Sequence, residues 1–423
     1  MHALLAILAL PSVSDAYGDV LTVYPFWVEQ GLGGEGRPGQ WLGVDVPWVY
    51  PLLAWAPILA SSAFGTAALP LVWMLLVTAL DAVALALLLR VPRGLVMAWA
   101  WLALLVALGP VAIARIDTVV VALCVIAIVA LRSDRPGVAA ALFTIGAWMK
   151  VWPGVLWLAL LVARRERMRV VAGGALVSAA VLALAALLGS QHALSFLTEQ
   201  DDRGLQIEAV AATPYLWLAS AGEAQVLFDR QIYTFQVEGD GVGSVAALAT
   251  PVLVAAVLAI GALGALAVRR AHRREAIVWL AVALVEAMIV TNKVGSPQFV
   301  LWLFVPALLL AEAGARRHWI GVGAIALVAA LTQLQFPWTY DWLVAAHPAA
   351  VALLTVRNAL HVALLVGAVW MLVRATRVGP VGASAQERRE QVADAARLDE
   401  ERVVAEAALE HDRLGARDAR RDP

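Results

Sequence analysis

Residues 94–132 read GLVMAWAWLALLVALGPVAIARIDTVVVALCVIAIVALR, and this stretch decides the fold class. It holds two apolar runs, 94–109 and 111–131, which meet at a Gly-Pro turn. Before the final arginine its only charged residues are Arg115 and Asp117. An apolar run of roughly 20 residues is long enough to cross a lipid bilayer as a helix. The stretch therefore predicts two successive membrane-spanning helices.

The composition of the whole chain excludes a water-soluble fold. Of the 423 residues, 62% are hydrophobic and 15% charged, and the mean hydropathy is +0.80, well above the usage of soluble domains. The net charge of -1 gives no support to a nucleic-acid partner. Cys124 is the single cysteine and lies in an apolar run. It excludes an intrachain disulfide and a cysteine-rich metal site, and we expect a buried thiol.

Similar apolar runs recur and predict an all-α, polytopic transmembrane bundle of about 11–13 spans. The run 137–163 has Lys150 and Pro153 at its middle; because a charge at bilayer depth is costly, we expect two short helices that meet near Lys150. Residues 48–63 are expected to form an interfacial or re-entrant helix. Residues 1–13 lack the basic segment of a signal peptide, so we expect a first transmembrane helix and a start codon upstream of Met1. Further spans are expected at 66–89, 170–189, 244–268, 275–291, 297–312, 318–336 and 347–373.

Basic clusters orient the predicted bundle, because short cytoplasmic loops retain Lys and Arg. The clusters expected to face the cytoplasm are Arg90/Arg93, Arg132/Arg135, 164–169, 269–274, Arg316/Arg317 and Arg374/Arg377. The segments expected to face outward are 14–47, 191–243, 292–298 and 337–348. The composition changes to Glu, Arg, Asp and Ala near Gly379. We therefore expect a transmembrane domain at 1–377 in the plasma membrane and a charged cytoplasmic tail at 378–423.

Polar residues expected near the outer leaflet are the candidates for chemistry. Asp19 lies in the first outward segment, where its carboxylate is suited to act as a general base; Asp45 of the same segment is the alternative. Several cations on one face are suited to bind a phosphate group. The candidate cations are Arg115, Lys150, Arg203 and Lys293, with Glu208, Arg357 and His361 as further polar groups on that side.

The same charges have structural interpretations. Arg115 can pair with Asp117, and Lys293 can pair with Glu286. Asp81 and Glu286 lie deeper, and we expect them to pair within the helix bundle, with a proton relay as the less favoured alternative. As a set, the outer cations favour an anion site.

An ordered series of short segments resembles glycosyltransferase family 87, whose members have the GT-C fold. The resemblance covers roughly 1–374. The segments that carry it are Gly18-Asp19-Val20 through Tyr24, Trp48-Val49-Tyr50-Pro51-Leu52, Arg115-Ile116-Asp117, Trp148-Met149-Lys150-Val151-Trp152-Pro153, Arg203-Gly204-Leu205-Gln206-Ile207-Glu208, and Ser296-Pro297-Gln298-Phe299 with Trp302.

The resemblance implies an inverting transfer of a sugar, mannose in the family, from a polyprenyl phosphate donor to a lipid or glycan acceptor outside the cytoplasm. It implies that Asp19 is the catalytic base. We expect no cofactor and no metal. The residues expected to contact the substrates are Arg115, Asp117, Lys150, Arg203, Glu208, Lys293 and Gln298. Family members place a histidine-bearing stretch after the late Ser-Pro, where this chain has Gln298-Phe299-Val300-Leu301-Trp302, and this departure leaves the identity of the sugar open.

Two other classes of membrane protein fit the composition. A transporter or flippase of lipid-linked sugars also carries intramembrane charges, but such proteins commonly show internal repeats, which this sequence lacks. A non-catalytic scaffold accounts for the charged tail and leaves the outer cations unexplained.

Overall fold

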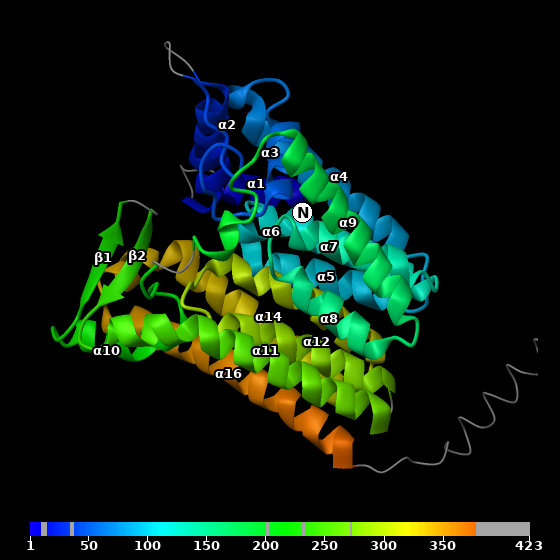
Figure 1. Cartoon of the computed structure of the whole chain (residues 1–423). Helices are drawn as coiled ribbons and strands as arrows, with labels where there is room; N and C mark the ends of the chain where they lie inside the picture. The colour runs from blue at the N-terminus through cyan, green and yellow to red at the C-terminus, as the bar shows by residue number, and fades with distance from the viewer. Residues whose placement is uncertain (10–14, 34–37, 200–202, 231–232, 271–272, 378–423) are drawn as a thin grey trace, which may run out of the picture. The chain divides into compact units, whose positions relative to one another are not determined.

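The computed structural model describes residues 1–9, 15–33, 38–199, 203–230, 233–270 and 273–377. Residues Met1–Thr376 form one compact unit made almost entirely of helices (Figure 1). The predicted all-α membrane bundle is confirmed. The predicted tail, 378–423, lies outside the described residues, and the predicted division of the chain at 377 stays a prediction.

The bounds of the elements are as follows. The α-helices are α1 (His2–Ala9), α2 (Tyr24–Leu32), α3 (Trp55–Ser61), α4 (Leu69–Leu88), α5 (Gly94–Leu108), α6 (Ile116–Arg132), α7 (Pro136–Ala147), α8 (Pro153–Ala163), α9 (Arg167–Leu187), α10 (Thr213–Ser220), α11 (Val242–Arg270), α12 (Arg273–Val290), α13 (Phe304–Ala313), α14 (Arg316–Gln333), α15 (Tyr340–Val344) and α16 (Pro348–Arg377). The shorter helical turns used below are η2 (Asp19–Val23), η8 (Pro297–Leu303) and η9 (Leu334–Trp338).

Six helical segments of the described residues are long and apolar enough to cross a membrane. They are Thr66–Leu88, Gly94–Ala112, Arg167–Leu187, Val242–Arg270, Arg316–Trp338 and Pro348–Arg377. Each lies at a predicted span. Helices also occupy the predicted spans at 111–131, 275–291 and 297–312, but α6 is shorter than expected, α12 carries four charges, and α13 follows the 3₁₀ turn η8. The predicted number of spans therefore stays a prediction.

Two short predicted elements have different outcomes. Residues 52–61 form a short apolar helix, in agreement with a segment that does not cross. In the first predicted span, α1 has eight residues, a length of about 12 Å, which alone does not cross a bilayer. The remainder of that predicted span lies outside the described residues.

The predicted break near Lys150 is confirmed. Helix α7 ends at Ala147 and α8 begins at Pro153. Proline has no N–H to continue a helix and is well suited to the first helical position. Gly146 lets the two helices approach, because a Cβ atom at this position would lie 3.2 Å from Pro153 Cγ and 3.3 Å from Val120 Cγ1. Lys150 is therefore placed at a turn between two short helices.

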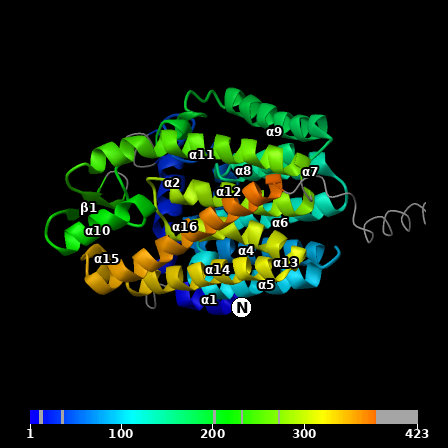
Figure 2. The ribbon, with the colours of Figure 1, turned by 90° about the horizontal axis from the view of Figure 1, so that it is seen from below.

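Helix α6 is the centre of the bundle. It packs against α4, α7 and α13, and most of its side chains are buried. In contrast, α4, α9 and α11 expose large apolar side chains such as Leu71, Leu176 and Leu258, and Figure 2 shows α9 as an outer helix. Exposed apolar surface of this extent is typical of helices that face lipid rather than water.

The long predicted outer segment, 191–243, contains structure that the sequence pattern did not predict. It holds α10 and a hairpin of strands β1 (Gln225–Asp229) and β2 (Thr234–Glu238). The strands are antiparallel, with Gln225 opposite Glu238. The residues before α10 pair with this hairpin: Ile207 N donates to Phe235 O, and Val237 N donates to Leu205 O. The hairpin thus fixes the path of 205–207.

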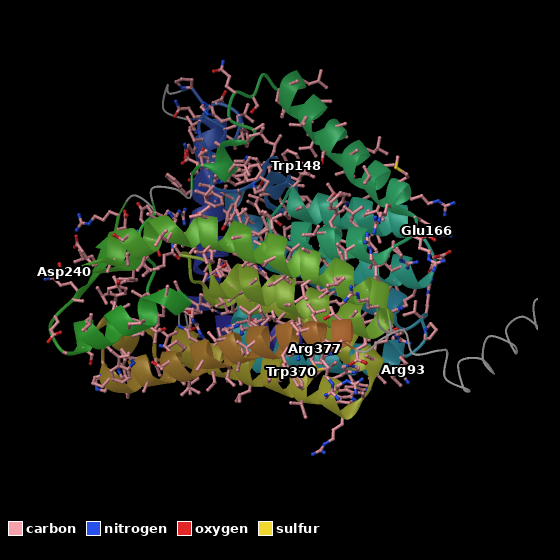
Figure 3. The ribbon with its side chains drawn as sticks, turned by 60° about the horizontal axis from the view of Figure 1, so that its bottom comes forward. Arg93, Trp148, Glu166, Asp240, Trp370 and Arg377 are labelled. Carbon is pink, nitrogen blue, oxygen red and sulfur yellow. The ribbon has the colours of Figure 1, made fainter. Side chains whose placement is uncertain are left out.

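Several predicted cytoplasmic basic clusters meet around one buried carboxylate, that of Glu312. Glu312 pairs with Arg132 and, at 3.2 Å, with Arg274, and its backbone carbonyl accepts a hydrogen bond from Arg93. Figure 3 labels Arg93 near one end of the bundle and Asp240, in the outer segment, near the other. The gathering of these clusters at one end agrees with the predicted basic face, while the side of the membrane that it faces stays a prediction.

We expect Glu312→Gln to lower the free energy of unfolding by about 1–3 kcal/mol, because the substitution removes the charge of a buried carboxylate that pairs with two arginines. Glu275→Gln is the matched control: Glu275 also binds an arginine, Arg317, at 2.6 Å, but that pair is more exposed, so its loss should cost less than about 1 kcal/mol. Thermal and denaturant unfolding of both variants in detergent measures the difference. Equal losses would contradict the anchoring role of Glu312.

Candidate active site

Asp19 and Arg115 form an ion pair at the end of the bundle that is predicted to face outward. Asp19 Oδ2 lies 3.4 Å from Arg115 Nε, and 28% of the Asp19 side chain is exposed. Asp19 begins the turn η2, which is a π-helix and continues into α2. Arg115 precedes α6 in an extended conformation, and its Nη1 donates to Ala16 O at 2.6 Å. The carboxylate is therefore oriented by a buried guanidinium and still accessible.

The tyrosine that follows the π turn joins the two segments. Tyr24 is fully buried, and its hydroxyl oxygen accepts a hydrogen bond of 3.1 Å from Ile116 N, the first residue of α6. In a π turn the backbone N–H of Tyr24 donates to the carbonyl of Asp19, five residues earlier. This contact fixes the position of Asp19 relative to α6.

A second ion pair joins Lys150 to Asp117. Lys150 Nζ lies 3.5 Å from Asp117 Oδ2, and the fully buried Asp117 accepts a hydrogen bond of 2.6 Å from Trp302 Nε1. Trp302 stacks against Trp152, with ring centres 5.8 Å apart. Asp117 lies in the first turn of α6, where the helix dipole favours a negative charge. Two segments far from Lys150 in sequence, the start of α6 and η8, therefore hold this lysine.

Tyr50 is a member of this cluster that was not among the predicted substrate contacts. Lys150 Nζ lies 4.2 Å from the centre of the Tyr50 ring, a cation–π distance. Burial lowers the pKa of Lys150, but Asp117, Tyr50 and Asp19 outweigh burial and raise it above its usual value. The ammonium group is therefore kept charged. The available signal was the position of Tyr50 in a Trp-Val-Tyr-Pro segment, which is equally typical of an interfacial aromatic residue.

Arg203 and Glu208 bring the outer segment to the cluster. Burial lowers the pKa of Arg203, and the nearby Tyr50, Asp229 and Glu199 act in the opposite direction. Burial raises the pKa of Glu208, and Arg357 and Arg115 act against it. Glu208 Oε2 accepts a hydrogen bond of 2.6 Å from Arg357 Nη1. Glu208 is thus paired with Arg357 of α16.

The remaining predicted residues have backbone or local contacts. Lys293 is buried, and its carbonyl accepts a hydrogen bond from Gln206 N at 3.0 Å. Gln298 is buried and hydrogen-bonded to Ser296 of the same turn. Asp45, the alternative base, is exposed and accepts a hydrogen bond from Trp41 N at 2.8 Å. Asp45 therefore caps a loop turn, whereas Asp19 contacts the cations.

The alternative internal pairs of Arg115 and Lys293 are not formed, whereas Asp81 and Glu286 both pair within the bundle, as expected. Arg115 pairs with Asp19, and Asp117 pairs with Lys150, because side chains two positions apart at a helix start do not face each other. Glu286 pairs with His361 at 2.9 Å instead of with Lys293. Asp81 is confirmed as a pairing group: its partner is His2, at 2.8 Å. Cys124 is buried, as expected.

The arrangement combines one accessible carboxylate with several cations. The carboxylate of Asp19 is suited to accept a proton, and Arg115, Lys150 and Arg203 are suited to stabilise an anion. Within the described parts of the chain, no group of three or more His, Cys, Asp or Glu side chains is arranged to hold a metal ion. The expectation that the protein uses no metal or cofactor stays a prediction.

Comparison with known proteins gives one family. The model of glycosyltransferase family 87 matches residues 48–292, more than half of the chain. The match includes Tyr50, Arg115, Lys150 and Arg203, whereas Asp19 precedes it. No curated protein matches the chain. On the strength of this match over most of its helical domain, the chain belongs to glycosyltransferase family 87.

Proposed function

We propose that this glycosyltransferase transfers a sugar from a polyprenyl phosphate donor to a hydroxyl group of a lipid or glycan acceptor, with Asp19 as general base. The observation that carries the proposal is the contact of accessible Asp19 with Arg115, 3.4 Å apart, beside Lys150. A base and cations for a leaving phosphate are both required for such a transfer.

The proposed reaction is a single displacement. The carboxylate of Asp19 accepts the proton of the acceptor hydroxyl as the hydroxyl oxygen attacks the anomeric carbon. The bond from that carbon to the phosphate oxygen breaks, and the phosphate leaves with the electron pair. Arg115, Lys150 and Arg203 stabilise the negative charge that develops on the phosphate. Attack from the face opposite the phosphate inverts the anomeric centre.

The Lys150 site is suited to a lipid-bound phosphate. The turn between α7 and α8 lies between helices that are short and apolar, and the ammonium group is held by Asp117 and Tyr50. A polyprenyl chain is compatible with such apolar surroundings, while its phosphate requires fixed cations. We propose mannose as the sugar by kinship with the family, the plasma membrane as the location, and the outer face as the side of the active site.

Asp19→Asn should lower the rate of sugar transfer by about 10²–10⁴-fold, because an amide cannot accept the proton of the acceptor hydroxyl. The measurement is transfer of radiolabelled mannose from polyprenyl phosphate mannose to a membrane-lipid extract by the purified protein in lipid nanodiscs. Asp45→Asn is the matched control, with the same chemical change in the same segment, and should keep its activity.

If only the Asp45 variant loses sugar transfer, Asp45 is the base instead of Asp19. If neither wild-type protein nor variants transfer mannose, other polyprenyl phosphate sugars are tested next. Failure with all of these donors would favour a transporter or a scaffold, for which Asp19→Asn has no effect.

Lys150→Met should reduce kcat by about 10²–10³-fold, because it removes a fixed positive charge from the leaving phosphate. Arg90→Gln removes a positive charge from an exposed position in a predicted cytoplasmic cluster and serves as the control. Steady-state kinetics with varied donor concentration separates kcat from KM. An unchanged kcat with a raised KM would assign Lys150 to ground-state donor binding instead of leaving-group stabilisation.

A further inference from the structure

Arg357 is an arginine buried in a long apolar helix. It is 4% exposed and is the tenth residue of α16, about 14 Å from the start of the helix. A charge in such surroundings is costly unless it is paired and fully hydrogen-bonded. The proposed reaction does not use it. Its contacts therefore require a separate explanation.

The guanidinium of Arg357 binds Glu208 twice. Nη1 donates to Glu208 Oε2 at 2.6 Å, and Nη2 donates to the backbone carbonyl of Glu208 at 2.8 Å. Asn358 accepts from Nε and Nη2 and donates to Thr213 Oγ1 at 2.8 Å. Side chain and backbone of one outer-segment residue are thus both fixed to α16.

The same short segment, 203–209, is held on two other sides. Gln206 N donates to Lys293 O at 3.0 Å, and Ile207 N donates to Phe235 O at 3.2 Å. Gly295 lies so close that a Cβ atom there would be 2.1 Å from Ala209 N. The first residue of this segment is Arg203, and its last but one is Glu208, the partner of Arg357.

The space beside Glu208 and Arg357 is small. The cavity lined there by Glu208, Arg357, Asn358 and His361 has a volume of about 10 Å³, which is the space of about one water molecule. A sugar does not fit. The pair of Glu208 and Arg357 is therefore placed to hold the segment.

We propose that Arg357 is a positioning residue, which fixes the segment 203–209 through Glu208 and thereby sets the position of Arg203, a proposed phosphate contact. The inference deepens the proposed function, on which it rests for the identity of the bound phosphate. Arg357 also supplies Glu208 with its own counter-charge. Arg115 therefore does not have to neutralise Glu208, and it can pair with Asp19 and with an incoming anion.

The test uses a double variant, Glu208→Gln with Arg357→Met, because removal of both charges avoids an unpaired buried ion. Arg374→Met is the control on the same helix; Arg374 is exposed and stacks on Trp370, with Cζ 5.6 Å from the ring centre. Hydrogen exchange of the full-length protein in nanodiscs reports the backbone of 203–209. We expect exchange at Gln206 and Ile207 to become about tenfold faster in the double variant and to be unchanged in the control.

Binding of undecaprenyl phosphate to the same samples reports the position of Arg203. The double variant and Arg203→Met should each weaken binding about tenfold, and the combination of all three substitutions should bind no more weakly than Arg203→Met alone, since both changes act through one residue. Unchanged exchange in the double variant would overturn the inference. Additive losses of affinity when all three substitutions are combined would also overturn the inference. If wild-type protein itself does not bind undecaprenyl phosphate, the proposed donor is wrong, and the exchange at 206–207 alone decides the inference.

Discussion

An ammonium group between two short apolar helices has to be paired, and in this protein Asp117 provides the charge. Asp117 in turn is held by Trp302, and Lys150 by Tyr50. This ion pair and its partners therefore join the start of α6, the break between α7 and α8, the segment of Tyr50 that precedes α3, and η8. The positions of these elements depend on the requirement that one buried lysine stays paired.

The charges around the candidate active site alternate. Asp19 lies against Arg115, Arg115 near Glu208, and Glu208 against Arg357. Each carboxylate has a cation of its own, so the cations are fixed in the absence of a ligand and need no reorganisation when a negative charge develops beside them. At the opposite end one buried carboxylate, Glu312, pairs with arginines of two separate helices, α6 and α12.

Local signals predicted most of the fold. A charge and a proline inside an apolar run both disfavour one continuous membrane-spanning helix, and the break at Lys150 followed from them. The contacts of Asp19 with Arg115 and of Lys150 with Asp117 agree with the expectation that these charges lie on one side of the membrane, while the catalytic roles and that side stay predictions. The partner of Glu208 was not predicted, because Arg357 is 149 positions away and nothing near either residue in sequence distinguishes this pair from other charges. Pairing Arg115 with Asp117 by proximity in sequence failed for a geometric reason, since the two side chains leave a helix start in different directions.

The π turn at Asp19 constrains the length of the segment between Asp19 and Tyr24. Each residue added to or removed from a helix rotates everything on one side of it by about 100° relative to the other side. A π turn is one residue longer than an α turn, so loss of one residue from 20–23 would restore regular geometry and turn Asp19 away from Arg115 while Tyr24 stayed in place. A variant that keeps the contact of Asp19 with Arg115 must therefore keep the length of this short segment as well as the buried side chain of Val20.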